Sequence, residues 1–179
     1  MKKGILFFKS LLLKVSLLLS NAVAQDRAIE YKIKAAYLYN FTKFITWPDS
    51  DAPTFNICIV GKDPFGKIIS PIETRSVKNK PIRVVRFNSL NQAKQCQLIY
   101  SAEINKKIFP GILTIQSLYP ILTVSDSKQF VQKGGMIAFI LKEGKVKLFI
   151  NLPVLRKSGL EISAKLLEVA ELYEGESND

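Results

Sequence analysis

The chain has 179 residues, with 26 Lys and Arg against 15 Asp and Glu, and no His. The absence of His removes the usual Ser-His and Cys-His nucleophile pairs and the commonest metal ligand, so an enzyme is the weaker hypothesis. A chain of this length predicts one domain that can bury a core without extra cross-links.

Residues 1–24 have the pattern of a secretory signal peptide. The segment begins "MKK", continues as a Leu-rich run and ends on the small residues of "NAVA", so we expect cleavage between Ala24 and Gln25. A membrane anchor is disfavoured because Lys9 and Lys14 break the apolar run into pieces shorter than the about 20 residues of a spanning helix. The mature protein is therefore expected to be exported and soluble.

The mature chain is expected to be basic. The leader holds four Lys and no acidic residue, which leaves 22 basic and 15 acidic residues, a net charge of +7. Nucleic acid is disfavoured as a partner, because export separates the protein from most of it and the basic residues are scattered. A membrane surface or an acidic protein fits the surplus better, and a merely solvated basic surface is the plain alternative.

Cys58 and Cys96 are the two cysteines of the chain. An oxidising compartment permits a disulfide between them, while two buried thiols in neighbouring strands would give the same sequence pattern. Two separated cysteines do not form a thiolate metal site by themselves. We therefore expect neither a metal nor another cofactor.

Residues 26–47 are predicted to form an amphipathic helix that Asp26 caps and Pro48 ends. An apolar stripe of this kind more often belongs to a core than to a binding surface. The polar turn "PDSDAP" follows the helix. The stripe consists of Ile29, Ile33, Ala36, Tyr37, Phe41, Phe44 and Ile45.

Short apolar runs then alternate with helical segments, which predicts a single-domain α/β sandwich with a mixed, mostly parallel sheet flanked by helices. Helices are expected at Pro64–Ser70 and at Ala102–Ser117, the second of them broken near "FPG". Another is expected after a capping box formed by Asp126 and Gln129. The predicted strands are Phe55–Val60, Ile82–Phe87, Gln97–Ser101, Ile121–Val124, Met136–Leu141 and Val146–Ile150.

The last two predicted strands form an antiparallel edge hairpin that turns at Glu143-Gly144. Lys145 and Lys147 alternate with apolar residues in the second strand, a pattern that protects a sheet edge, so the sheet is expected to end there. Further on, the pattern predicts a helical turn, a break at Gly159 and a closing helix "ISAKLLEVAELY". Residues 174–179 are expected to form a polar tail.

The stretch "VGKDPFGKI" differs in one position from a phosphate-binding loop, since Ile68 stands where a Ser or Thr would bind Mg²⁺. Pro64 also removes one backbone donor, and Asp63 places a negative charge where phosphate would lie. The residues fit a strand-to-helix turn instead, in which Gly61 turns the chain and Asp63 caps the helix. We therefore predict no nucleotide binding.

Carboxylate pairs are the remaining candidates for acid–base chemistry. Asp49 and Asp51 lie in the polar turn, and Glu168 and Glu171 lie on an exposed face of the closing helix. Both pairs are better explained as solvated surface charge. The sequence therefore favours a binding protein over a catalyst.

Several stretches together resemble the YfiR family of periplasmic proteins: "KAAYLYNFTKFITWP", "ICIVGKDPFG", "CQLIYS", "ILTVSDSKQFVQKGGMIAFIL" and "LFINLPVLRKSGLEISAKLLEVA". The resemblance covers nearly the whole of residues 25–173. It implies a regulator that represses a membrane-bound diguanylate cyclase by binding its periplasmic domain, which lowers cyclic di-GMP and biofilm formation. It also implies an outer-membrane lipoprotein that draws the repressor away, and a homodimer. YfiR has four cysteines, and only the pair that matches Cys58 and Cys96 is present here.

Exposed apolar residues and Arg are the usual anchors of a protein-binding surface. The stretch "NLPVLRK" offers Asn151, Leu152, Leu155 and Arg156 beside the expected sheet edge. The alternative is that both leucines belong to the core of a short helix.

A periplasmic small-molecule sensor is the second functional hypothesis, because α/β sheets bind ligands beyond the carboxyl ends of their strands. Its test is whether the polar residues at those ends meet in one pocket. The candidates are Gly61, Ser101, Ser125, Asp126 and Asn151.

Overall fold

The structure is a computed structural model that describes residues 25–103 and 106–175. The predicted signal peptide, residues 1–24, lies outside the described residues, as do residues 176–179 of the predicted tail. Within the described part, no helix combines the length and the apolar character that crossing a membrane requires.

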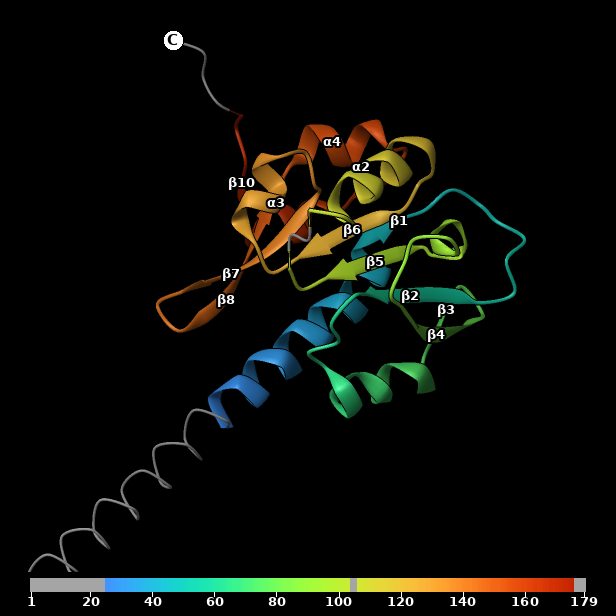
Figure 1. The fold of residues 1–179 in the computed structure, drawn as a ribbon, viewed down its shortest axis with the longest axis horizontal. Helices are drawn as coiled ribbons and strands as arrows, with labels where there is room; N and C mark the ends of the chain where they lie inside the picture. The colour runs from blue at the N-terminus through green and yellow to red at the C-terminus, as the bar shows by residue number, and fades with distance from the viewer. Residues whose placement is uncertain (1–24, 104–105, 176–179) are drawn as a thin grey trace, which may run out of the picture.

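The described residues form one mixed sheet of eight strands (Figure 1). The strands are β2 (Phe55–Val60), β3 (Ser76–Val77), β4 (Lys80–Phe87), β5 (Leu98–Ser101), β6 (Leu122–Ser125), β7 (Ile137–Lys142), β8 (Lys145–Ile150) and β10 (Ala170–Leu172). Their order is β10-β8-β7-β6-β5-β2-β4-β3. The neighbours from β4 to β7 run parallel, and β10 runs parallel to β8, whereas β3 is antiparallel to β4 and β8 is antiparallel to β7. This confirms the predicted α/β class with a mixed, mostly parallel sheet.

Helices cover both faces of the sheet. They are an N-terminal helix (residues 25–44), the 3₁₀ helices η1 (Gly66–Thr74) and η2 (Ala93–Gln95), and α2 (Phe109–Leu118), α3 (Lys128–Gln132), α4 (Leu152–Lys157) and α5 (Ala164–Leu167). The N-terminal helix and η1 lie on one side, and α2 and α3 lie on the other (Figure 1). Each side has its own apolar core, one around Phe41 and the other around Phe130. The domain therefore has three layers.

The N-terminal helix packs on the sheet through its second half. Phe41 is fully buried and stacks on Phe139 of β7, with ring centroids 6.0 Å apart. By contrast, Ile29, Ile33 and Ala36 of the predicted stripe are exposed, so the expectation that such a stripe belongs to the core holds only for its later residues.

The helix ends at residue 44, earlier than the predicted end at residue 47. The next two residues form the short strand β1 (Ile45–Thr46), which pairs antiparallel with β9 (Glu161–Ile162). The helix therefore ends before Pro48, because the backbone of Ile45 and Thr46 pairs with β9 instead of continuing the helix.

The predicted hairpin between β7 and β8 is confirmed. Glu143 and Gly144 have φ values of +52° and +72°, the two left-handed residues of a tight two-residue turn. Lys145 and Lys147 are exposed, as predicted from the alternation. However, β8 is not the sheet edge, because β10 pairs with it in parallel.

The predicted closing helix is wrong. The segment instead divides into β9, the single turn of α5 and the edge strand β10. Leu166 of α5 is buried in the core, while Val169 is exposed. Residues Ala170–Leu172 form backbone hydrogen bonds to β8 although their spacing favours a helix. This pairing covers the edge of β8, which would otherwise expose unpaired backbone groups.

Two helix boundaries also differ from expectation. The helix α2 begins at Phe109, several residues after the predicted start at Ala102. The N-cap of α3 is Ser127, which makes no capping hydrogen bond through its side chain. The predicted capping box of Asp126 and Gln129 is therefore wrong, and the Asp126 carboxylate binds other residues.

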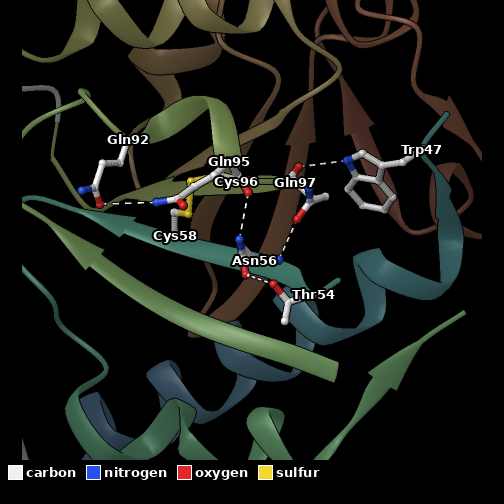
Figure 2. Close-up of a disulfide and its surroundings, with 8 residues drawn as sticks. All are labelled: Trp47, Thr54, Asn56, Cys58, Gln92, Gln95, Cys96 and Gln97. Atoms are coloured by element: carbon white, nitrogen blue, oxygen red, sulfur yellow. Dashed lines mark hydrogen bonds between the residues drawn. A yellow bond between two sulfur atoms is a disulfide. The ribbon is translucent and has the colours of Figure 1, made fainter. Parts of the chain in front are cut away.

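Cys58 and Cys96 form a disulfide with their Cα atoms 5.9 Å apart. Both residues are buried on the α2 and α3 side of the sheet. The bridge joins the middle of β2 to the residue that precedes Gln97 and β5 (Figure 2). It therefore pins two neighbouring strands that a long connection separates in sequence.

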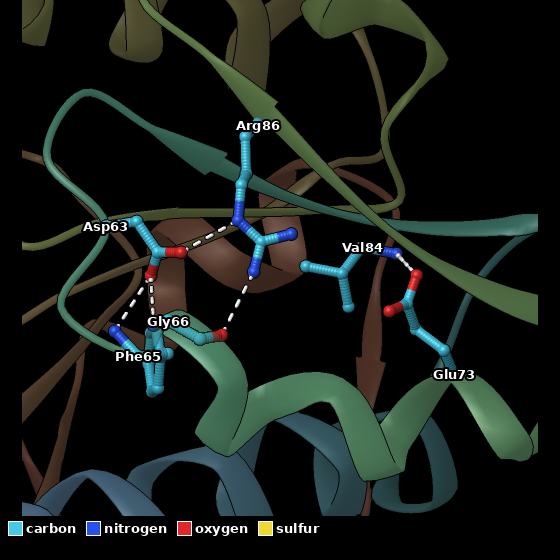
Figure 3. A network of polar contacts seen from close by, with 6 residues as sticks. All are labelled: Asp63, Phe65, Gly66, Glu73, Val84 and Arg86. Carbon is cyan, nitrogen blue, oxygen red and sulfur yellow. Dashed lines mark hydrogen bonds and ion pairs between the residues drawn. The ribbon is translucent and has the colours of Figure 1, made fainter.

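The segment that resembles a phosphate loop is a strand-to-helix turn. Gly61 has a φ of +81°, and the backbone N–H groups of Phe65 and Gly66 donate to Asp63 Oδ1 over 2.8 and 3.2 Å. Arg86 Nε donates to the other Asp63 oxygen over 2.7 Å (Figure 3). The carboxylate thus occupies two backbone donors at this turn. The helix η1 begins at Gly66 with Phe65 as its N-cap, so the predicted cap at Asp63 is shifted by two residues.

Candidate functional site

The stretch predicted to bind a partner forms α4 and its N-cap. Asn151 Oδ1 accepts a hydrogen bond from the Val154 backbone N–H over 3.2 Å, and Asn151 Nδ2 donates to the Val131 carbonyl oxygen over 3.3 Å. Leu155 is fully buried in the core. These two side chains point into the domain, so they hold α4 in place rather than offering a surface.

Leu152 and Arg156 are the accessible members of the predicted set. Leu152 is half-buried and Arg156 is exposed. Arg156 also borders a shallow hollow of about 380 Å³ that Leu160 and Glu161 line. A partner that contacts α4 can therefore reach a guanidinium group and a neighbouring recess.

The polar residues at the carboxyl ends of the strands gather only in part. Ser101 pairs with Ser125 across β5 and β6, and Gly61 follows β2 at the same edge. The Ser101 hydroxyl donates to the Glu103 carbonyl oxygen over 3.1 Å. Asn151 does not join them, because it follows β8, which runs antiparallel to β7 and therefore ends at the other edge of the sheet. Its side chain binds the carbonyl oxygen of Val131 in α3 instead. This distribution does not support the predicted ligand crevice.

A buried ion-pair cluster lies at this edge, below the N-terminal helix. The Lys34 ammonium is 2.5 Å from Glu30 Oε1 and 2.8 Å from Asp126 Oδ2. The Tyr31 hydroxyl donates to the same Asp126 oxygen over 3.2 Å. Burial and then the Asp126 charge raise the pKa of Tyr31 to about 12, and the same two causes raise the pKa of the buried Tyr100 hydroxyl. The cluster ties the helix to the sheet.

A groove of about 680 Å³ opens at the opposite, amino-terminal edge of β2, β4 and β5. One wall is the chain from the end of the N-terminal helix through Trp47 to Thr54, and the other is the β3–β4 hairpin. Lys78 and Asn79 form the two-residue turn of that hairpin, with φ values of +47° and +66°. Sequence analysis missed this groove, although the chain's single Trp beside Pro48 was a signal for it.

The floor of the groove is ordered by Gln97. Its backbone oxygen accepts a hydrogen bond from Trp47 Nε1 over 2.9 Å, and its side-chain Oε1 accepts one from the Asn56 N–H over 2.6 Å (Figure 2). The Trp47 ring meets Phe55 edge-on, with centroids 5.0 Å apart. The disulfide is adjacent to Gln97 in sequence, so it braces this floor.

The carboxylates considered as acid–base candidates lie at the surface, since Asp49, Asp51 and Glu168 are exposed and Glu171 is partly exposed. Asp49 is fully exposed and lies 3.6 Å from the Lys78 ammonium. Glu171 belongs to β10, where a hydrogen bond from Lys142 lowers its pKa. No group of three or more His, Cys, Asp or Glu that could hold a metal ion occurs among the described residues.

Comparison with known proteins shows a shared fold and a family. The chain is similar to a solved structure described as the ABC domain in complex with L-Trp from Streptococcus pneumonia, with 12% sequence identity and a TM-score of 0.51. The match covers 75% of this chain and 59% of that chain, so it spans less than two thirds of that protein and shows the fold alone. None of the curated protein sequences matches the chain.

The sequence model described as YfiR/HmsC-like matches residues 31–171, from the N-terminal helix to the edge strand β10. This span contains the disulfide, the groove and the α4 surface. Because the match includes well over half of the chain, the chain belongs to the YfiR/HmsC-like family.

Proposed function

We propose that the protein is a periplasmic regulatory protein that represses a membrane-bound diguanylate cyclase by binding the periplasmic domain of that enzyme. Its presence then lowers cyclic di-GMP and biofilm formation. The observation that carries the proposal is the family match over residues 31–171. The leader-like pattern of residues 1–24 and the basic surplus of the chain support it.

The partner surface in this proposal is centred on α4. Arg156 is the anchor, because a guanidinium group forms paired hydrogen bonds to carboxylates, and Leu152 adds an apolar contact. Asn151 and Leu155 contribute by fixing α4 through its cap and its buried face. An outer-membrane lipoprotein that competes for the repressor would relieve the repression.

Repression requires differential binding. A protein that bound the active and the inactive cyclase equally would leave their ratio unchanged, however tightly it bound. The repressor must therefore favour the inactive arrangement of the periplasmic domain.

The test exchanges Arg156 for Glu. Loss of a central anchor typically costs more than about 2 kcal/mol, which is roughly thirtyfold in affinity. Arg156→Glu should fold normally and leave cyclic di-GMP and biofilm high, whereas Lys145→Glu on the exposed hairpin should repress like the parent. A well-folded Arg156→Glu that represses fully would show that the α4 surface is misplaced.

Export and partner identity have their own measurements. Mass spectrometry of the periplasmic fraction should find a chain that begins at Gln25.

The mature protein should capture a diguanylate cyclase from detergent-solubilised inner membrane, and sedimentation should give the mass of a dimer. If deleting the gene leaves cyclic di-GMP unchanged, the repressor proposal fails and a small-molecule sensor becomes the better hypothesis.

A further inference from the structure

The groove beside Trp47 has the size of a small-molecule site. Its volume of about 680 Å³ falls inside the range of roughly 300–1,000 Å³ that such sites occupy. It lies at the amino-terminal edge of the sheet, away from the strand ends where a ligand was expected from the sequence. It also differs from the recess beside Arg156, with which it shares no lining residue.

The apolar part of the groove is already ordered. The indole N–H of Trp47 is bound to the Gln97 carbonyl oxygen, so the ring offers an apolar face and has no free donor. Phe55 holds the ring edge-on, and Ile45 is buried beside them. A wall that is fixed in advance costs little ordering entropy when a ligand binds.

The rim of the groove carries excess positive charge. The Lys80 ammonium donates to the Ser50 carbonyl oxygen, and the Lys43 ammonium lies 4.4 Å from the centre of the Tyr39 ring. Within the described ranges, neither ammonium has a carboxylate within ion-pair distance. Lys78 is paired with Asp49, but both side chains are highly exposed, and such pairs are weak.

We propose that this groove binds a small organic anion with a flat apolar body and a carboxylate group. The body lies against Trp47 and Phe55, and the carboxylate contacts Lys80, with Lys43 adding to the positive potential. Three lysines and two carboxylates, those of Asp49 and Asp51, line the site, so the lining keeps a net positive charge that disfavours an ammonium on the ligand. Ligand binding in this groove does not require the cyclase, so its test is independent of the proposed function.

The test uses the intrinsic fluorescence of Trp47, which is the single Trp of the chain. The mature protein with its disulfide intact is titrated with 4-phenylbutyrate and, as a matched cation, with 4-phenylbutylamine. We expect a saturable change with the acid and an affinity for the amine that is at least about tenfold weaker, since the amine puts a like-charge contact where the acid makes a charge-assisted hydrogen bond. No saturable change with the acid, or equal affinity for the amine, would overturn the proposal.

Lysine variants identify the cationic rim. Lys80→Gln should weaken the binding of 4-phenylbutyrate about tenfold, because it removes the charge-assisted hydrogen bond. Lys43→Gln should weaken it by a smaller factor, because it removes only a nearby positive charge. Lys133→Gln, an exposed position at the end of α3, should bind like the parent. Circular dichroism checks folding, and Lys43→Gln carries the test if the loss of the Lys80 contact to Ser50 disturbs the loop. Unchanged binding in the folded rim variants, or an equal loss in Lys133→Gln, would contradict the assignment.

Discussion

The ammonium group of Lys34 lies between the carboxylates of Glu30 and Asp126, and its side chain is only 6% exposed. Taking a charge out of water costs several kcal/mol, which opposite charges and hydrogen bonds offset only while all of them are present. Asp126 belongs to the loop after β6, whereas Lys34 belongs to the N-terminal helix. The charges therefore couple the helix to the sheet.

Replacing Lys34 by Met tests this coupling. The variant leaves two carboxylates facing each other in a partly buried site, so we expect a loss of about 3 kcal/mol in the free energy of unfolding. Lys142→Met is the control, because the Lys142–Glu171 pair is exposed to solvent and should contribute little to the free energy of unfolding. Urea unfolding measures both values, and equal losses would contradict a special role for the buried site.

The phenols of Tyr31 and Tyr100 give the fold a dependence on alkaline pH. Both pKa values are raised, that of Tyr31 to about 12, so the folded protein holds protons that the unfolded chain releases near pH 10. Their contribution to stability is full below about pH 10 and is lost as the pH rises through the folded pKa.

Urea unfolding at about pH 9 and about pH 11 should therefore show a fall in the free energy of unfolding. The fall should be smaller in Tyr31→Phe, because that variant removes one of the raised pKa values. Absorbance of the phenolate near 295 nm follows the titration directly. A fall of the same size in Tyr31→Phe would show that other groups cause it.

At the scale of elements, local patterns in the sequence predicted the strands that lie inside the sheet. Phe55–Val60 is reproduced residue for residue, because a short apolar run next to a turn is a strong strand signal. The closing helix failed because β10 depends on the free edge of β8, a partner that helical spacing cannot reveal. The predicted Asp126 cap failed because a distant Lys34 binds that carboxylate.

Among the candidate sites, local sequence likewise revealed some features and missed those that depend on distant segments. Cys58 and Cys96 could be named as a possible pair from residue type and order, but the sequence left open whether they are bonded, and Arg156 stays a candidate of which the structure shows only the exposure. Burial of Leu155 against the core could not be decided, since a short apolar helix fits a core and a binding surface equally well. The groove was missed because Trp47, Lys80 and Gln97 come from three separate segments that only the sheet brings together.

The Cys58–Cys96 disulfide connects the core to the groove. The two residues are 38 positions apart, and closing a loop of that length stabilises by about 4 kcal/mol in the chain-entropy model. The double variant Cys58→Ala/Cys96→Ala should lose stability of that order, as measured by urea unfolding. Its Trp47 emission should also shift to longer wavelength, because Gln97 follows Cys96 and holds the indole. Unchanged emission would show that the floor of the groove is independent of the bridge.

The three-layer domain belongs to a chain with a surplus of basic residues. Cleavage after Ala24, which is a prediction, would leave a chain with 22 basic and 15 acidic residues. Scattered positive charge of this kind creates a long-range field that attracts an acidic protein before any contact forms. The exposed hairpin lysines contribute to that field, whereas Arg156 is proposed to make the contact itself.

The two roles predict different kinetics for binding to the periplasmic domain of the cyclase. Raising the salt from about 50 mM to about 500 mM shortens the screening length, so the association rate constant should fall severalfold while the dissociation rate constant changes little. Lys145→Glu should lower the association rate only slightly, since it alters one rim charge. Arg156→Glu should mainly speed dissociation, because a lost anchor shortens the lifetime of the complex. Surface plasmon resonance with the purified domains separates the two constants. An association rate constant that does not change with salt would contradict steering by the net charge. A dissociation rate constant of Arg156→Glu equal to that of the parent would show that α4 lies outside the interface.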